Sequence, residues 1–175
     1  MQKKVLTTLT NAIRTQPDFK FLHAHFAHFF ALGFGSGLAP KAPGTAGTLV
    51  AFPLYWLIRD LSLGYRFTIV TLLFGIGIYF CSKTNQSLGV ADHGSIVWDE
   101  IVAMMMVLTF TPRHWAFWIL AFALFRLFDI WKPFPIKQCD AKFKNGFGVM
   151  FDDILAAIYA ILCMQVMVLW LISKH

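Results

Sequence analysis

Long apolar runs separated by short polar segments dominate the chain. The runs cover residues 49–58, 67–82, 96–110, 115–131 and 154–172, and the first could extend to residues 45–60. Several are shorter than the ~20 residues that a straight membrane span needs, so we expect each to gain a turn from its polar flanks. The pattern predicts an all-α fold: a small polytopic membrane helix bundle with about five membrane-embedded helices.

The segment before these runs has a different character. Residues 1–18 are mostly polar, which predicts an N-terminal arm. Residues 19–32 are rich in aromatic side chains and contain His23, His25 and His28. This aromatic segment is short for a span, which favours a helix lying in the membrane interface, with a re-entrant segment as the alternative. We therefore expect the arm to precede a single membrane-embedded domain at residues 19–175.

Composition supports a membrane protein. The chain is 58% hydrophobic and 17% aromatic, but only 14% of its residues are charged. Soluble domains carry about 25% charged residues, so an ordinary soluble fold is not expected. The first 20 residues lack an apolar core, and we expect no signal peptide. The spacing of the three cysteines, Cys81, Cys139 and Cys163, is not that of a metal site. The expected partner is the lipid bilayer, and no nucleic acid is expected.

The basic residues predict an orientation. If the segment before residue 49 is cytoplasmic, the cytoplasmic side carries most of them, as the positive-inside rule requires. The cytoplasmic set is Lys3, Lys4, Arg14, Lys20, Lys41, Lys83, Lys132, Lys137, Lys142 and Lys144. The outer set is Arg59, Arg66, Arg113 and Lys174.

The same topology gathers most of the carboxylates on the cytoplasmic face. Only Asp18 and Asp60 of the nine acidic residues fall outside this group. Its members are Asp92, Asp99, Glu100, Asp129, Asp140, Asp152 and Asp153. Carboxylates at the ends of apolar helices are costly, so their presence there indicates a function.

The first acidic segment is DHGSIVWDE at residues 92–100. If it is helical, Asp92 and Asp99 share one face two turns apart; if residues 92–95 form a turn, Asp92 can fold back towards Asp99. A purely structural alternative is that Asp92 caps a turn while Asp99 and Glu100 interact with a helix dipole.

Two further groups lie around the stretch from residue 125 to 153. Arg126 and Asp129 are three residues apart on one helical face, where they could also form a structural ion pair between helices. Lys132 precedes Pro133, a common position for an interfacial anchor. Adjacent carboxylates at 152 and 153 repel each other unless a cation lies nearby.

Within the segment GFGSGLAPKAPGTAGT at residues 33–48, the loop 35–48 is a candidate phosphate cradle. Its glycines and prolines argue against a regular helix, leave backbone N–H groups free, and make a tight interfacial loop the alternative. It lacks Walker spacing. The candidate substrate-binding residues here are Gly35, Ser36, Lys41, Thr45 and Thr48.

Acidic side chains from three segments on one membrane face predict a site for Mg²⁺, which prefers carboxylate and water oxygens. Arg126, Lys132 and the glycine-rich segment suit phosphate. Magnesium together with phosphate indicates phosphoryl chemistry. The histidines at 23, 25 and 28 lack acidic or cysteine partners nearby, which favours an interfacial role over zinc. No Cys-x5-Arg or Asp-x-Asp-x-Thr phosphatase motif is present.

Four motifs, in this order, resemble the phosphatidylglycerophosphatase A family. They are GSGLAPKAPGTAGT (35–48), DHGSIVWDE (92–100), FRLFDIWKPFPI (125–136) and GFGVMFDD (146–153). The resemblance implies an all-α, Mg²⁺-dependent lipid phosphatase of the bacterial cytoplasmic membrane that converts phosphatidylglycerophosphate to phosphatidylglycerol and phosphate in phospholipid biosynthesis.

This reading assigns roles to the acidic and basic residues. The expected metal ligands are Asp99, Glu100, Asp129, Asp152 and Asp153. The expected catalytic residues are Asp92, Asp99, Asp153, Arg126 and Lys132. Asp92 serves as a ligand or as the base that orients water, and Arg126 and Lys132 also bind the phosphate, on the cytoplasmic side. Water is favoured over an aspartate as the nucleophile. The alternatives are a small cation-binding membrane transporter and a structural membrane protein, and the oligomeric state is left open.

Overall fold

The computed structural model describes residues 16–90, 92–143 and 145–174, and these ranges contain helices and no strand. The helices are α2 (Phe19–Ala24), α3 (Phe26–Ala31), the 3-10 turn η1 (Gly33–Leu38), α4 (Pro43–Ile58), α5 (Leu63–Leu88), α6 (Trp98–Thr109), α7 (Trp115–Trp131), α8 (Ile136–Lys142) and α9 (Gly146–Ser173). The predicted all-α class is confirmed for this part of the chain. The arm at residues 1–15, with Lys3, Lys4 and Arg14, lies outside the described residues, as does Lys144.

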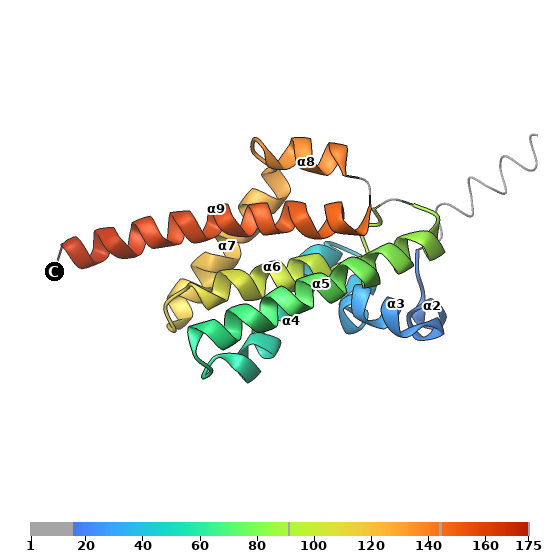
Figure 1. Cartoon of the computed structure of the whole chain (residues 1–175), viewed down its shortest axis with the longest axis horizontal. Coiled ribbons are helices and arrows are strands. Elements are labelled where there is room, and N and C mark those ends of the chain that lie inside the picture. The colour runs from blue at the N-terminus through green and yellow to red at the C-terminus, as the bar shows by residue number, and fades with distance from the viewer. Residues whose placement is uncertain (1–15, 91, 144, 175) are drawn as a thin grey trace, which may run out of the picture.

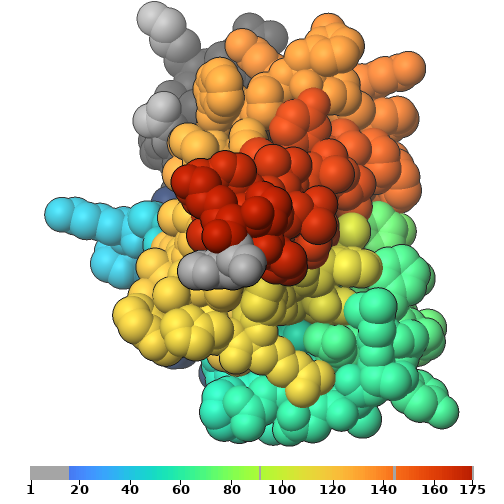
Figure 2. All heavy atoms as spheres, turned by 90° about the vertical axis from the view of Figure 1, so that its left-hand side faces the viewer, coloured from blue at the N-terminus to red at the C-terminus, as the bar shows by residue number. Residues whose placement is uncertain are grey.

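Two helices are long and apolar enough to cross a membrane, judged by length and composition. They are α5 with 26 residues and α9 with 28 residues. Helix α9 runs along the bundle, and its C-terminal turns project beyond the other helices (Figure 1). Figure 2 looks at this side of the molecule and shows the C-terminal end of α9 end-on, near the centre of the view. Its outer side chains are apolar and exposed, as Leu169, Trp170 and Ile172 illustrate.

Helix α6 lies at the centre of the bundle, in contact with α4, α5, α7 and α9. Ten of its 12 residues are buried, so it exposes almost no surface. A helix that is apolar all round is stable only when neighbours cover every side. Small residues permit this close approach. A Cβ atom at Gly47 would collide with Val97, and one at Gly77 would collide with Trp98 and Met150.

The bundle has two distinct ends. At one end, the first turn of α4 meets α6 and α7, because Gly44 lies against Glu100 and Arg126. At the same end the last turns of α5 meet the start of α9, where Gly146 lies against Ser82. At the opposite end Arg113 pairs with Asp60 at 3.4 Å, in the turns between the helices. The predicted gathering of acidic residues at one end of the bundle is thus consistent with the helix order.

The aromatic segment at residues 19–32 forms two short helices rather than the single helix that we expected. His25 ends α2 and caps α3, since its Nδ1 accepts a hydrogen bond from the backbone N–H of Ala27. The pair packs against α5: His28 Nδ1 and Thr84 Oγ1 are 2.9 Å apart, and the ring of Phe30 stacks on that of Phe80. The histidines here therefore have local structural roles.

Three boundaries also differ from the prediction. Helix α4 begins at residue 43, two residues before the earliest start that we expected for this run, because Pro43 suits the start of a helix. Helix α9 begins at residue 146, not 154, since the side chain of Asn145 caps it. The expected loop after Pro133 contains α8, which packs on α9 through the buried Ile136.

We predict that Thr84→Val weakens the attachment of α3 to α5. The substitution keeps the shape of the side chain but leaves the buried His28 without its hydrogen-bond partner, which costs about 1 kcal/mol. In a chain of this size that corresponds to a fall in Tm of about 2–4 °C in detergent. Thr68→Val is the control, because the Thr68 hydroxyl donates to the carbonyl of Gly64 within the same helix and is exposed. Equal Tm values for both variants would contradict the prediction.

Candidate active site

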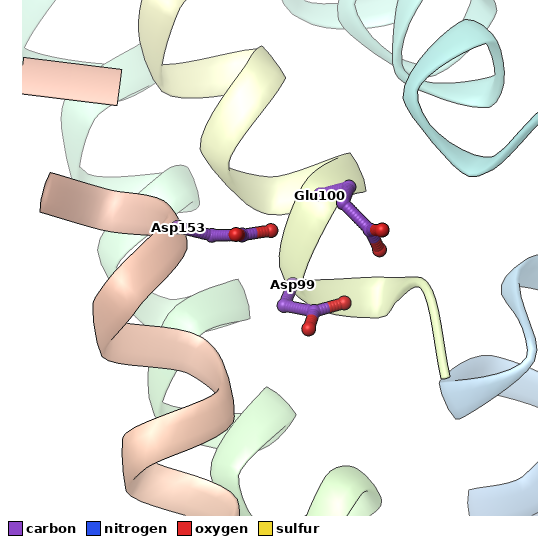
Figure 3. A group of neighbouring side chains, drawn as sticks. All are labelled: Asp99, Glu100 and Asp153. Atoms are coloured by element: carbon purple, nitrogen blue, oxygen red, sulfur yellow. The ribbon is translucent and has the colours of Figure 1, made fainter. Parts of the chain in front are cut away.

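Three carboxylates converge between α6 and α9. Asp99 and Glu100 lie in the first turn of α6, and Asp153 lies in the second turn of α9. One oxygen from each lies within 4.8 Å of the other two, and Figure 3 shows Asp153 reaching from α9 towards α6. We call these residues the acidic triad. The positive end of the α6 dipole favours the two carboxylates in its first turn, where the N-cap Val97 supplies no side-chain hydrogen bond.

The triad is buried, and its oxygens are incompletely satisfied. Asp99 is 8% exposed and Asp153 is 4% exposed. Within the described part of the chain, Oδ1 of Asp99, Oε2 of Glu100 and Oδ2 of Asp153 are buried without a hydrogen-bond partner. Like charges this close, removed from water, repel one another unless a cation lies between them. Three convergent carboxylate oxygens are a ligand set suited to a hard divalent cation.

Arg126 links the triad to α7. Its Nη1 lies 2.5 Å from Asp129 Oδ2 and 3.7 Å from Glu100 Oε1. It also donates to Thr48 Oγ1 at 3.4 Å, which ties α7 to α4. The guanidinium is mostly buried and its Nε lacks a hydrogen-bond partner among the described residues. One donor of a planar, permanently charged group is therefore buried without an acceptor.

Lys132 offsets the other aspartate of α9. It ends α7 with a left-handed backbone, and its Nζ lies 2.5 Å from Asp152 Oδ2 and 3.3 Å from Asp140 Oδ2. Burial alone would lower the pKa of Lys132, but the hydrogen bond to Asp152 and the charges of both aspartates raise that pKa above its ordinary value. Lys132 therefore stays cationic and holds together α7, α8 and α9.

The first turn of α4 closes the site from another side. A Cβ atom at Gly44 would collide with Glu100 Oε1 and crowd the Arg126 guanidinium, so a larger residue there would displace these two side chains. The Thr48 hydroxyl donates to the Gly44 carbonyl at 2.8 Å and accepts from Arg126. The N-terminus of α4 has no side-chain cap. Its free N–H groups thus lie near the basic group that borders the triad.

The predicted site residues do not all meet at one point. Asp99, Glu100 and Asp153 form the triad, whereas Asp129 pairs with Arg126 and Asp152 with Lys132. Asp92 lies in a turn before α6 and is exposed, so the turn alternative for residues 92–95 holds.

In the glycine-rich segment, Thr48 reaches Arg126, while other members serve the loop itself. Gly35 has a positive φ of 102° and lies near Leu22, and the Ser36 hydroxyl donates to the Gly33 carbonyl. Lys41 is exposed and Thr45 is half-buried in the first turns of α4.

Two residues of the site had no role assigned from the sequence, although Asp140 was counted in the acidic group and Gly44 lies in the glycine-rich segment. Asp140 is the second carboxylate on Lys132, and Gly44 provides the close approach of α4. Gly44 follows a proline at the start of a helix, a spacing that marks a first helical turn. Asp140 gave no comparable signal, because it lies in the short helix that hydropathy did not reveal.

A helical bundle that encloses three carboxylates able to hold a divalent cation, with an arginine and a lysine beside them, has the features of an enzyme that acts on phosphate groups. In such enzymes, cationic groups offset the charge of the phosphate.

Comparison with known sequences identifies the family within this class. Residues 29–168 match the family model for phosphatidylglycerophosphatase A. Phosphatidylglycerophosphatase A of Haemophilus influenzae is 48% identical over 148 residues, which cover 83% of this chain and 90% of that protein. The enzyme of the same name from Escherichia coli is 44% identical over 132 residues, covering 75% and 77%. A putative phosphatidylinositol-3-phosphatase of Bacteroides thetaiotaomicron is 39% identical over 142 residues, covering 77% and 88%. No solved structure matches the chain.

The chain belongs to the phosphatidylglycerophosphatase A family. It is accordingly a phosphoric monoester hydrolase that converts phosphatidylglycerophosphate to phosphatidylglycerol in phospholipid biosynthesis, as the motifs predicted.

We predict that Asp153→Asn raises the Tm of the metal-free protein, because it removes one of three buried like charges. The same variant should lose the rise in Tm that a divalent cation gives the unsubstituted protein. At a cation concentration 100 times Kd, that stabilisation is about 2.7 kcal/mol. Asp60→Asn, at the opposite end of the bundle, is the control and should keep the rise. A cation-induced rise that survives in Asp153→Asn would show that the triad is not the cation site.

Proposed function

We propose that the chain carries out this hydrolysis with Mg²⁺ held by the acidic triad. The proposal rests on one observation: Asp99, Glu100 and Asp153 converge with buried, unpartnered oxygens beside Arg126. Mg²⁺ is favoured over softer cations because each triad member offers a hard carboxylate oxygen. When bound, Mg²⁺ supplies positive charge to the phosphoryl oxygens and makes water more acidic. Asp129 and Asp152 lie next to the triad in this proposal. Asp129 orients Arg126 and Asp152 orients Lys132.

The phosphate lies, in this proposal, between Arg126 and the first turn of α4. Arg126 keeps its Nε donor for a phosphate oxygen, and Thr48 fixes the position of the guanidinium. The uncapped N-terminus of α4 and the half-buried Thr45 add donors on the same side. Lys132 contributes charge from the α9 side. Gly35 and Ser36 shape the loop that covers this region, and the exposed Lys41 attracts the anionic headgroup.

Water is the proposed nucleophile, and Asp92 is its proton acceptor. Asp92 lies in the exposed turn that leads into α6, seven residues before Asp99. A carboxylate at the solvent side of the triad can take the proton from an attacking water and pass it to bulk solvent. Arg126 then stabilises the charge that develops on the phosphoryl oxygens. The bond to the lipid oxygen breaks, and that oxygen takes up a proton from solvent, so that the lipid alcohol leaves with its acyl chains still in the bilayer.

The proposed setting is the bacterial inner membrane, with one membrane-embedded domain at residues 19–175. Five helices, α4, α5, α6, α7 and α9, lie within the bilayer in this proposal, and α2 and α3 lie at its interface. The exposed rings of Phe19 and Phe26 support interfacial contact. Helices α4, α6 and α7 are shorter than a full span, which suits a site close to the cytoplasmic surface. The triad then faces the cytoplasm with the basic loops.

The reaction itself gives a direct test. Purified protein in detergent should release phosphate from phosphatidylglycerophosphate with Mg²⁺ and release none after chelation. Asp99→Asn and Asp153→Asn should each lower kcat at least 10³-fold while the protein still inserts and purifies normally, because each removes a charged ligand. Asp60→Asn should keep full activity. Normal Mg²⁺-dependent phosphate release by both triad variants would refute the site assignment.

The side of the membrane on which the site lies can be tested with a native cysteine. Cys139 lies in α8 and is partly exposed, beside Asp140 of the site. In a Cys81→Ala/Cys163→Ala background, a membrane-impermeant maleimide should label Cys139 in inside-out vesicles and not in intact spheroplasts. Asp60→Cys in a background that also lacks Cys139 should show the opposite pattern. Labelling of Cys139 from outside would reverse the proposed orientation.

A further inference from the structure

A polar cavity lies at the end of the bundle opposite the acidic triad. It has a volume of about 320 Å³ and lies between the start of α5, the turn that follows α6, and α9. Its polar lining includes Arg66, Thr111, Arg113 and Gln165. Figure 2 looks onto this end of the molecule. Because two arginines line this space, we call it the arginine cavity.

Arg66 of α5 forms hydrogen bonds with two neighbouring helices. Its Nη1 donates to the hydroxyl of the buried Tyr55 in α4 at 2.5 Å and to the backbone carbonyl of Thr109 in α6 at 3.3 Å. Among the described residues, Nε of Arg66 is buried without an acceptor. A guanidinium keeps its proton in proteins, so burial does not remove its charge. Arg66 therefore brings a permanent positive charge into the bundle, where the acceptors that it contacts are neutral.

The acidic side chains do not offset this charge. All nine Asp and Glu residues lie in the described ranges, and the ion pairs found among the described residues do not include Arg66. At this end, Asp60 lies 3.4 Å from both Arg59 and Arg113. One carboxylate is thus shared by two arginines and leaves the third without a counter-charge. Positive charge is in excess at this end of the bundle.

The arginine cavity provides the space for an anion. A cation inside an apolar bundle is costly unless a negative charge lies near it. Arg66 lines the cavity from α5, and Arg113 lines it from the turn between α6 and α7. Two arginine side chains around one space suit a phosphate group, because the planar pairs of N–H donors match phosphate oxygens.

The surroundings of the cavity indicate a lipid phosphate rather than a soluble one. The rings of Trp56, Tyr65 and Trp115 are exposed near the turns at this end. Exposed Trp and Tyr side chains gather at the level of the lipid headgroups, where phosphate groups also lie. Leu63 and Phe110 line the cavity beside the arginines. A ligand that carries both a phosphate and apolar chains matches this mixed lining.

The cavity is remote from the phosphate that the enzyme hydrolyses. Gln165 of the cavity follows Asp153 of the triad by twelve residues along α9, a rise of about 18 Å. When the bundle lies across a bilayer, its two ends meet different leaflets. A lipid in the arginine cavity is therefore a second molecule and not the substrate at the triad.

We propose that the arginine cavity binds the phosphate of a membrane phospholipid in the leaflet opposite the triad. The inference goes beyond the proposed function, since it requires the chain to lie in a bilayer but requires neither the metal nor the reaction. The bound lipid joins α5 to the turn after α6 through the two arginines. Arg66 extends this contact to Tyr55 of α4. The lipid thus stabilises the bundle at the end where the short helices stop.

The test compares three substitutions at this end. Arg113→Gln removes a cation from the lining of the cavity, and Arg113→Lys keeps the positive charge. Arg59→Gln is the matched control, because Arg59 also lies 3.4 Å from Asp60 but does not line the cavity. All proteins are studied in a neutral detergent with a chelator, so that no metal binds at the triad.

Phosphatidylglycerol is added to each protein, native mass spectrometry counts the bound lipids, and Tm is followed in parallel. Arg113→Gln should raise the Kd of one bound lipid about tenfold, the effect of losing one hydrogen bond to a charged group, and should reduce the rise in Tm. Arg113→Lys should recover most of the affinity, and Arg59→Gln should match the unsubstituted protein. Lipid bound at the triad end is common to all variants. An unchanged Kd in Arg113→Gln, or an equal rise in Kd in Arg59→Gln, would overturn the inference.

Two further ligands identify the source of the phosphate. Inorganic phosphate lacks acyl chains and diacylglycerol lacks phosphate, so neither should give a rise in Tm that depends on Arg113. Such a rise with inorganic phosphate would show a site for soluble anions, and one with diacylglycerol would show apolar docking; either would overturn the inference. Phosphate release from phosphatidylglycerophosphate is measured separately, and Arg113→Gln should keep kcat. Failure of the unsubstituted protein to release phosphate would refute the proposed function alone.

Discussion

Repulsion among buried carboxylates is the constraint on which the rest of the structure depends. Asp99, Glu100 and Asp153 are brought together where water cannot separate their charges. The cost of this arrangement is large unless cations offset it, and Arg126 and Lys132 offset it only in part, through the neighbouring pairs with Asp129 and Asp152. The triad therefore has a deficit of positive charge, which a divalent cation would offset.

Packing around α6 keeps the carboxylates in place despite this repulsion. Nearly every side chain of α6 is buried, so the helix has no free side towards which it could shift. Glycines at 44, 47 and 77 bring α4 and α5 against its first turns. A rigid position matters, because a metal site or a phosphoryl-transfer site loses function when its ligands move by even 1 Å.

Hydropathy and motif spacing accounted for much of this arrangement. All five apolar runs became helices, and every member of the triad had been named, because carboxylates next to apolar runs are conspicuous. What the sequence did not reveal depends on tertiary contact. Helix α8 has a mixed composition, and its packing on α9 through Ile136 is not visible in the local pattern. The division between Arg126, which reaches Glu100, and Lys132, which reaches Asp152, also required the three-dimensional positions of both helices.

The order of the charges along the chain has a consequence for biogenesis. Chains are synthesised from the N-terminus, so the two carboxylates of α6 leave the ribosome before Arg126 and Lys132, and the aspartates of α9 follow last. Both cations therefore lie, in sequence, between the two acidic segments. Arg126 pairs with Glu100 of the first segment, and Lys132 pairs with Asp152 of the second. Neither acidic segment can be neutralised within itself, and the charge network closes only when α9 has joined the bundle. Assembly of the site therefore follows the synthesis of α9, the last of these helices along the chain.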